Sequence, residues 1–514
     1  MWDSKILDEL KKKRDDAYIG GGEKRIDKQH TSGKLTARER LDILFDEGTF
    51  VELGTFREAR PDKSGDDVKI YPGDGVVTGY GKVNGRTVFA SSEDFTVNGG
   101  SLGEAHSQKI CHVMDLAMTA KCPFVSINDS GGARIEEGIN SIAGYSGIFL
   151  RNTKASGVIP QIAVILGPCA GGACYSPAIC DFVFMSEETS RMFITGPVVV
   201  KASMHETISS EDLGGARVHA TKSGVAHFVY EDDEACLEGV RYLLSYLPQN
   251  NEEQPPFEES VPVDGSEEIE EIVPENMRMA YDVRDVIATF VDEGTFLEVQ
   301  PEFAQNVVVG FARLDGYTLG VVANQPCVAA GTLDIDTSDK AARFIRFCDC
   351  FNIPIMTLVD VPGYMPGSIQ EHSGIIRHGA KILFAYSEAT VPKVGLIMRK
   401  AYGGAYIAMN SKRMGADLVY AWPIAQIAVM GPEGAVDILY KKQLKEAEDP
   451  VGERARLVEE YEKKYLNPYI GAANGYIDDV IAPEDTREVI SRAFESLRGK
   501  KAESPWKKHG NIPL

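Results

Sequence analysis

The sequence has no unbroken apolar run long enough to cross a membrane, and it has no excess of basic residues. Its longest apolar stretch, residues 157–180, is interrupted by three prolines and several glycines, which argues against a membrane helix. The 54 basic and 76 acidic side chains give a formal net charge of −22. Because phosphate binding needs a basic surface, we expect no nucleic-acid partner. The first residues are polar and lack the apolar core of a secretory signal, so we expect a cytoplasmic protein.

Other absences concern metals and nucleotides. The nine cysteines include two close pairs, Cys169/Cys174 and Cys348/Cys350, but neither pair has the spacing of a zinc ribbon. Most cysteines lie in apolar runs, which predicts reduced, buried thiols and no metal in this chain. No Gly-x-x-x-x-Gly-Lys-[Ser/Thr] segment occurs, which excludes a Walker-type ATP site.

The chain contains two copies of one pattern. Four pairs of segments match in the same order at a nearly constant separation. They are residues 79–88 with 310–319 (310 − 79 = 231), 124–132 with 355–363 (355 − 124 = 231), 158–166 with 390–398 (390 − 158 = 232), and the glycine pairs 171–172 with 403–404 (403 − 171 = 232). A series of this kind indicates a tandem duplication rather than shared local propensity. We therefore predict two homologous domains, at residues 1–250 and 278–514.

An acidic segment separates the two predicted domains. Residues 251–274 contain nine acidic residues, four prolines and no basic residue. Such a composition cannot bury enough apolar surface to fold alone. We therefore predict a linker or surface excursion over residues 251–277.

Each half alternates short apolar runs with helical patterns. In the first half, Thr87–Ala90, Phe124–Ile127 and Gln161–Leu166 are predicted to be buried strands. Residues 104–120 and 138–153 are predicted to be helices between them. Strands that alternate with helices predict an α/β fold built from parallel βαβ units.

Glycine-rich segments follow two of these strands, at residues 128–134 and 167–177. In α/β sheets such loops are where ligands bind. A strand followed by Gly-Gly and a helix presents unpaired backbone N–H groups, and two of them aimed at a carbonyl oxygen make an oxyanion hole. For Gly171-Gly172 alone, a tight turn with close helix–sheet packing is the simpler interpretation. The recurrence at Gly403-Gly404 favours the oxyanion hole.

Three other candidates have structural interpretations that we prefer. Adjacent helical residues point in different directions, so Glu136-Glu137 indicates a solvated helix face rather than an acid/base pair. His378 is interpreted as a structural hydrogen-bonding histidine. The segment Gly79-x-Gly81-x-x-x-Gly85 lacks dinucleotide-binding spacing and predicts a hairpin turn.

Several longer motifs together resemble one known family. They are Ser130-Gly-Gly-Ala-Arg134, Gly167-Pro-Cys-Ala-Gly-Gly-Ala173, Arg399-Lys-Ala-Tyr-Gly-Gly-Ala-Tyr406 and the C-terminal Lys507-Lys-His-Gly-Asn-Ile-Pro-Leu514. The chain resembles the carboxyltransferase subunit of biotin-dependent acyl-CoA carboxylases, within the group of propionyl-CoA carboxylase β, methylmalonyl-CoA decarboxylase α and transcarboxylase large subunits. The resemblance extends over nearly the whole sequence, from residues 21–30 onward.

The resemblance implies two crotonase-like (ClpP/crotonase) ββα-superhelix domains, the first binding acyl-CoA and the second binding carboxybiotin. It implies a hexamer in which the N-domain of one subunit and the C-domain of another form each site. The family's thioester-side oxyanion hole corresponds to Gly171 and Gly172, and its biotin-side hole to Gly404 and Ala405. Further substrate-binding positions implied by the resemblance are Ser130, Gly131, Gly132, Ala133, Arg134, Ala170, Tyr175, Gly403 and Ile407. In such a mechanism N1 of biotin takes the α-proton, so no side-chain base is expected.

Missing parts also bear on partners and substrate. There is no Met-Lys-Met biotinylation site, because Met277-Arg-Met279 lacks the lysine. Biotin is therefore expected on a partner carrier protein, with a biotin carboxylase or a membrane decarboxylase subunit as a further partner. Ile407 stands where propionyl-CoA carboxylases often carry Asp, which favours a component of methylmalonyl-CoA decarboxylase or transcarboxylase. The alternative is the β subunit of an ATP-dependent propionyl-CoA carboxylase.

Two other function classes compete with this interpretation. A crotonase-type hydratase or hydrolase requires a side-chain acid or base, and Glu136 and Glu137 are poor candidates for it. A catalytically inert scaffold that assembles carrier proteins needs no function for the glycine loops. The CoA phosphates require basic residues, and Arg25, Lys28 and Lys34 are available, although surface ion pairing explains them equally well.

Overall fold

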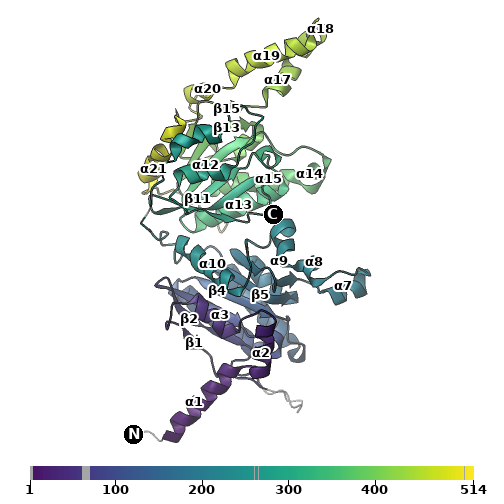
Figure 1. The fold of residues 1–514 in the computed structure, drawn as a ribbon, viewed down its shortest axis with the longest axis vertical. Coiled ribbons are helices and arrows are strands. Elements are labelled where there is room, and N and C mark those ends of the chain that lie inside the picture. Colours follow the sequence, from purple (N-terminus) through teal and green to yellow (C-terminus); the bar gives the residue numbers. More distant parts are fainter. Residues whose placement is uncertain (1–3, 61–69, 260, 264, 503) are drawn as a thin grey trace. The chain divides into compact units, whose positions relative to one another are not determined.

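The computed structural model describes residues 4–60, 70–259, 261–263, 265–502 and 504–514. The chain divides into two compact units, Met1–Glu253 and Gln254–Leu514, which are described separately (Figure 1). Among the described helices, none is both long and apolar enough to cross a membrane.

The first unit is built on a mixed sheet with strand order β1-β2-β3-β4-β5-β6-β8, and β7 pairs with β5 beside this path. The β1–β2 and β2–β3 pairs are antiparallel, whereas all later pairs are parallel. The strands are β1 (Val51–Leu53), β2 (Val76–Val83), β3 (Arg86–Glu93), β4 (Phe124–Ser130), β5 (Gln161–Ala170), β6 (Phe182–Ser186), β7 (Arg191–Phe193) and β8 (Phe228–Tyr230).

The second unit repeats this sheet, with order β16-β14-β13-β12-β11-β10-β9 and β15 paired with β13. Its strands are β9 (Leu297–Val299), β10 (Val307–Leu314), β11 (Tyr317–Asn324), β12 (Ile355–Val361), β13 (Lys393–Tyr402), β14 (Leu418–Ala421), β15 (Gln426–Ala428) and β16 (Asp479–Val480). The same order and the same mixture of antiparallel and parallel pairs confirm the predicted α/β fold and its tandem duplication.

Helices cover both faces of each sheet. In the first unit they are α1 (Ser4–Ile19), α2 (Glu23–Thr31), α3 (Ala37–Leu44), α4 (Glu104–Ala120), α5 (Ile139–Ala155), α6 (Tyr175–Ile179), α7 (Pro197–Met204), α8 (Ser210–Gly214), α9 (Ala216–Val218) and α10 (Asp233–Tyr246). In the second unit they are α11 (Ile269–Ile272), α12 (Val283–Phe290), α13 (Ile335–Cys350), α14 (Ser368–Ser373), α15 (Ile375–Glu388), α16 (Gly403–Ala408), α17 (Pro432–Leu439), α18 (Lys441–Glu446), α19 (Pro450–Tyr465), α20 (Pro468–Ala473) and α21 (Thr486–Leu497).

Helices α4 and α5 of the first unit correspond to α13 and α15 of the second, and α3 and α10 correspond to α12 and α21. In the first unit, α4 and α5 bury apolar residues in one core cluster with β3, β4 and β5. In the second, α12 and α21 pack on β10 to β13 through a core that includes Phe290 and Ile490. The pairs α3/α10 and α12/α21 share one equivalent hydrogen bond. Arg241 of α10 donates to the carbonyl of Leu44, the last residue of α3, and Arg487 of α21 donates to the carbonyl of Phe290, the last residue of α12, each at 2.7 Å.

The predicted elements lie close to their observed positions. The helix expected at residues 104–120 is α4, and the helix expected at 138–153 is α5, shifted by one or two residues at its ends. The three predicted strands are β3, β4 and β5. The predicted hairpin turn joins β2 to β3, where Asn84 and Gly85 have φ values of 50° and 76°. Glycine and asparagine tolerate this left-handed conformation, so these predictions are confirmed.

The acidic segment is more structured than its composition predicts. From Gln254 onward its described residues belong to the second unit. The Glu258 carboxylate lies 2.9 Å from the Arg313 guanidinium, and Ile269 and Val273 are buried in the second core. Spaced apolar residues thus pack this segment against the core of the second unit.

A buried carboxylate lies at the carboxyl end of the central strand in the first unit. Asp129 is fully buried and accepts hydrogen bonds from Lys34 Nζ at 2.9 Å and from Arg40 Nη1 at 3.0 Å. Arg40, also fully buried, reaches on to Asp233 at 2.8 Å and to the Leu166 carbonyl at 2.7 Å. This cluster joins the N-terminal helices to the sheet and to α10.

Asp360 occupies the equivalent position in the second unit (360 − 129 = 231). It is fully buried, and its partner is Arg399 of β13 at 2.8 Å. Arg399 also donates to the carbonyls of Pro274, Asn276 and Met279. The residue of the first unit that matches Arg399 is Gly167, where a Cβ would overlap the Asp129 carboxylate. The two units therefore neutralise the same carboxylate from different elements.

Replacing Asp129 with Asn should destabilise the first unit strongly, because Lys34 and Arg40 then lose their buried countercharge. We expect a loss of about 3–5 kcal/mol in the free energy of unfolding, measured by urea denaturation. The control is Asp115→Asn, which removes an exposed ion pair with Arg151 and should cost at most about 1 kcal/mol. Equal effects of the two substitutions would contradict the anchoring role of Asp129.

Candidate active site

Two loops of the first unit meet where neighbouring parallel strands end. Ser130 at the end of β4 pairs with Cys169 near the end of β5. Gly132 has a φ of 101°, and a Cβ there would lie 2.9 Å from the Ala170 carbonyl oxygen. Only glycine permits both this conformation and this approach. The structure therefore brings the predicted Ser130–Arg134 and Ala170–Gly172 segments together.

The Gly171-Gly172 turn links β5 to a short 3₁₀ helix, Gly171–Cys174. Gly171 has a φ of 62°, and a Cβ at Gly172 would lie 2.9 Å from the ring of Tyr145. The first N–H groups of a helix have no acceptor within it. Both glycine residues are partly exposed, and an oxyanion hole at this turn stays a prediction.

The second unit repeats this turn between β13 and α16. Gly403 has a φ of 59°, close to that of Gly171. A Cβ at Gly404 would meet no heavy atom within 4 Å. Ala405 is buried, whereas Ile407, one helical turn after Gly403, is 45 % exposed. The turn thus combines helix N–H groups with open space beside Gly404.

Two polar residues of the first loop have structural partners. The Ser130 hydroxyl donates to the Gly100 carbonyl at 2.6 Å and accepts from the Gly132 N–H at 3.2 Å. Arg134 is buried, with Nη1 at 2.7 Å from Asp74 and 2.6 Å from Glu137. In this conformation Arg134 holds the loop in place, and its charge is already paired.

The remaining predicted substrate positions border the same turn. The Gly131 N–H donates to the Gly99 carbonyl at 3.0 Å, and Ala133 is half-buried. Tyr175, 45 % exposed, begins α6 directly after the 3₁₀ helix, and its ring meets Phe149 edge-on with centroids 5.9 Å apart.

The weaker candidates have structural partners in the fold. His378 lies 2.9 Å from an Asp339 carboxylate oxygen, which confirms its hydrogen-bonding interpretation. Glu136 is exposed, but Glu137 accepts from the Glu104 N–H at 2.6 Å and caps α4. The solvated-face prediction therefore fails for Glu137, because the loop turns its carboxylate back onto a helix N-terminus.

Of the three basic residues available for CoA phosphates, Lys34 and Arg25 already have partners. Lys34 is buried against Asp129. Arg25 is exposed and donates to the Thr96 carbonyl at 2.9 Å, and Lys28 is exposed on α2.

Sequence reasoning missed the residues that support the turns. Asp129 and Asp360 lie at matching positions of the repeat, and that match was the available signal. The sheets are also irregular at these residues, since the register shifts between Asn128 and Ser130 and between Val359 and Val361. No sequence signal connects Tyr145 to Gly172, because their contact depends on how α5 packs.

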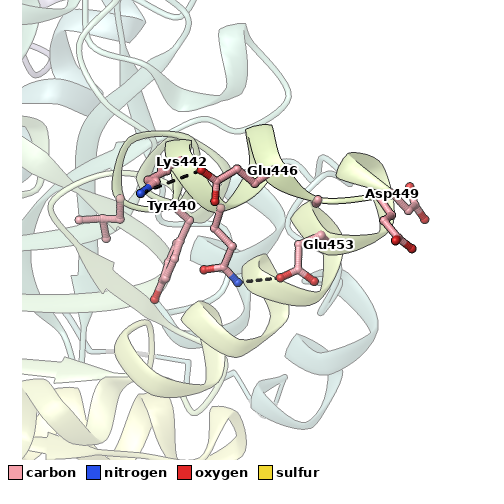
Figure 2. A pocket seen from close by; sticks show the side chains of 9 residues that line it. Tyr440, Lys442, Glu446, Asp449 and Glu453 are labelled. Atoms are coloured by element: carbon pink, nitrogen blue, oxygen red, sulfur yellow. Dashed lines mark hydrogen bonds and ion pairs between the residues drawn. The ribbon is translucent and has the colours of Figure 1, made fainter.

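A recess of about 750 Å³ lies on the α17–α19 extension of the second unit (Figure 2). Its walls carry Tyr440, Lys442, Glu446, Asp449 and Glu453. Gln443 Nε2 donates to Glu453 at 2.7 Å. The residues lining it are mostly charged and include none of the predicted site residues.

The carboxyl transferase domain family matches residues 28–512. The chain belongs to this family. It is 57 % identical over 510 residues to the propionyl-CoA carboxylase carboxyltransferase subunit of Haloferax mediterranei, covering 99 % of both chains. It is 54 % identical over 514 residues to the methylmalonyl-CoA decarboxylase α subunit of Propionigenium modestum, again covering 99 % of both. The chain is a biotin-dependent acyl-CoA carboxyltransferase of this group.

A solved structure extends the comparison to the fold of this carboxyltransferase. The hexameric transcarboxylase 12S subunit, with methylmalonyl-CoA and methylmalonic acid bound, matches with a TM-score of 0.95 and 52 % identity. The match covers 99 % of this chain and 98 % of that one. It confirms the expected duplication of a crotonase-like fold.

Gly404→Ala should separate activity from folding. The added methyl group meets no atom within 4 Å, so the melting temperature should stay within about 1 °C of wild type. The methyl group enters the space beside the helix N–H groups, so carboxyl transfer should fall by about tenfold or more. Gly499→Ala adds a methyl group in equally open space outside the site and should leave both quantities unchanged. Full activity of Gly404→Ala would remove this turn from the site.

Proposed function

We propose that this carboxyltransferase moves a carboxyl group between biotin on a carrier protein and a short-chain acyl-CoA, methylmalonyl-CoA or propionyl-CoA. One observation carries the proposal most directly. The chain holds two equivalent glycine turns, with Gly171 at φ 62° and Gly403 at φ 59°, each at the end of the longest strand of its sheet. Two turns suit a reaction with two carbonyl substrates.

Each turn is assigned to one substrate. The first domain, residues 1–250, binds the acyl-CoA thioester through the Gly171 and Gly172 N–H groups. The second domain, residues 278–514, binds biotin at Gly404 and Ala405. The open space at Gly404 and the exposed Ile407 beside it fit a planar ring carried in from outside. Carboxybiotin bound there would supply the carboxyl group, or free biotin would accept it, and N1 of the decarboxylated biotin, rather than a side chain, would take the α-proton.

The chain's own contribution is electrostatic. Transfer passes through a thioester enolate, whose negative oxygen needs hydrogen-bond donors already in place. Each N–H donor of an oxyanion hole contributes about 3–4 kcal/mol of transition-state stabilisation. The left-handed glycine turns fix these donors before substrate arrives, so no reorganisation is needed during the reaction. Loop 130–134 closes the same site, with Arg134 positioning it through Asp74.

We infer that the chain is a component of a methylmalonyl-CoA decarboxylase or a transcarboxylase. The exposed apolar side chain of Ile407 at the second turn supports this assignment over one that needs a carboxylate there. The alternative is the β subunit of an ATP-dependent propionyl-CoA carboxylase, and relatives of both kinds are similar over the whole chain.

Exposed apolar residues beside both turns support assembly into a hexamer. In the first unit Ile194, Val198 and Met204 are 62 %, 83 % and 73 % exposed. In the second unit Val429 and Ile438 are 85 % and 64 % exposed. Patches of this kind mark interaction sites. We propose that α7 of one subunit meets the α17 region of another, which completes each site.

Further partners follow from the chemistry that the chain leaves to others. A biotin carboxyl carrier protein must deliver the biotin, and a biotin carboxylase or a membrane decarboxylase subunit would supply or consume the carboxyl group. We also propose a cytoplasmic location, with attachment to a membrane only through a partner subunit.

Incubation of the purified chain with methylmalonyl-CoA and free biotin tests the reaction. We expect propionyl-CoA to form only when biotin is present, measured by liquid chromatography. Gly171→Val should abolish turnover, because a β-branched residue cannot adopt the left-handed φ and its side chain blocks the N–H groups. Biotin-independent hydration or hydrolysis would favour a crotonase-type enzyme instead. An inactive protein that still binds carrier would favour a scaffold.

Val198→Asp should weaken subunit association, because it places a charge in the apolar face that we assign to the interface. We expect smaller species by sedimentation velocity, together with a parallel loss of turnover. Val51→Asp changes another exposed valine, 43 % exposed and away from the turn, and should leave the assembly intact. An unchanged hexamer in Val198→Asp would contradict the proposed interface.

A further inference from the structure

Glu93 is a buried carboxyl group behind the proposed thioester site that the proposed reaction does not use. It ends β3 and is 5 % exposed. Its Oε2 accepts a hydrogen bond from the Asp129 N–H at 2.9 Å. Asp129 immediately precedes Ser130, the first residue of the substrate loop. Glu93 therefore holds the backbone from which that loop departs.

The second oxygen of Glu93 faces a histidine. Oε1 lies 3.7 Å from Nε2 of His106, which is fully buried on α4. Nδ1 of His106 lies 3.1 Å from the Asp74 carbonyl, an acceptor only, so Nδ1 carries the proton. A neutral His106 then directs its Nε2 lone pair toward Glu93, and Nε2 has no hydrogen-bond partner among the described residues. The Nε2 lone pair and an ionised Glu93 oxygen would both be hydrogen-bond acceptors, so their close approach requires a proton on one of the two groups.

Glu93 also lines a small internal cavity that reaches Tyr145. The cavity measures about 20 Å³ and is bordered by Glu93, Asn128, Tyr145 and Ser176, which is room for a single water molecule. The Tyr145 ring is the surface on which Gly172 rests. Glu93 thus adjoins both supports of the site: the start of loop 130–134 and the ring beneath the glycine turn.

The internal repeat provides an independent comparison. The residue equivalent to Glu93 in the second unit is Asn324 (324 − 93 = 231). Its Oδ1 accepts from the Asp360 N–H at 3.3 Å, as Glu93 accepts from Asp129. Its amide group donates to the Gly331 carbonyl at 3.1 Å. The same position is thus filled by a neutral side chain that both accepts and donates.

We propose that Glu93 is a neutral carboxylic acid in the folded protein, donating its proton toward His106, and that it is a positioning residue for the substrate loop. The effect on turnover rests on the proposed function, whereas the protonation state does not. A neutral acid matches the donor and acceptor roles of Asn324. It also avoids placing a second negative charge beside the buried Asp129.

The titration of these groups agrees with that assignment. Burial raises the pKa of Glu93 to about 8 and lowers the pKa of His106 to about 3. The charged or titratable groups around Glu93 are Arg40 on α3, His106 on α4, Asp129 on β4, Tyr145 on α5 and Cys169 on β5.

The sign of the pH dependence follows from this raised pKa. An unfolded chain releases the Glu93 proton near pH 4.5, whereas the folded chain keeps it until about pH 8. Between these values the folded state binds more protons, so wild-type stability falls as the pH rises. Above about pH 8 the penalty is constant, and the ionised carboxylate repels Asp129.

Glu93→Gln tests the proposal, because glutamine keeps the shape and donor capacity of the neutral acid but cannot ionise. Its melting temperature relative to wild type should rise steadily from about pH 5 to about pH 8. In the biotin-dependent assay, wild-type kcat should decline above about pH 8, and Glu93→Gln should lack that decline. Glu93→Ala, which removes both contacts, should lower kcat at every pH. Glu234→Gln, the same change at an exposed position, should show no pH-dependent gain.

Two results would overturn the proposal. If Glu93 were ionised and paired with a protonated His106, Glu93→Gln would leave a buried charge and lower the melting temperature throughout this range. If the wild type and Glu93→Gln shared one alkaline kcat profile, Glu93 would not position the loop. An inactive wild type would count against the proposed function alone, because the melting comparison needs no activity.

Discussion

In each unit, one fully buried carboxylate at the carboxyl end of the central strand organises the surrounding structure. Asp129 and Asp360 lie where the strand register shifts, so the regular ladder is interrupted at the point where the loops after β4 and β12 begin. Removing a charge from water costs several kcal/mol unless cations and N–H groups surround it. The cations and N–H groups that surround each carboxylate come from segments far apart in the sequence. They hold those segments at the end of the central strand, next to each proposed site.

The periodic and repeated parts of the sequence predicted the fold well. Helix α4 and the strands β3 to β5 follow from apolar patterning, and the duplication follows from matched segments. The glycine turns were found for a physical reason, since few residues other than glycine adopt φ near 60°. The paired charge of Arg134 and the packing of Tyr145 against Gly172 were not predictable. Both depend on contacts between elements that are far apart in the sequence.

The acidic segment, residues 251–277, also shows that contacts between distant elements cannot be predicted from local sequence. Its composition predicted a segment that cannot fold alone. Composition does not reveal that Phe257, Ile269 and Val273 find apolar partners in the second unit, because burial depends on the surface that a segment meets. Charge counts describe a segment in isolation, whereas its structure is decided by the few apolar side chains between the charges.

The two units would respond differently to a break in the chain, because the cations that neutralise Asp129 and Asp360 come from different parts of each unit. Arg40 and Lys34 precede the first strand of their sheet, and the chain between α3 and β1 is their covalent link to it. Arg399 belongs to a strand of the second sheet itself. A cut after α3 would turn the neutralisation of Asp129 into an association between two molecules, dependent on concentration. The equivalent cut before β9 would leave Asp360 with its arginine. The first half is therefore the one whose integrity depends on an intact N-terminal segment.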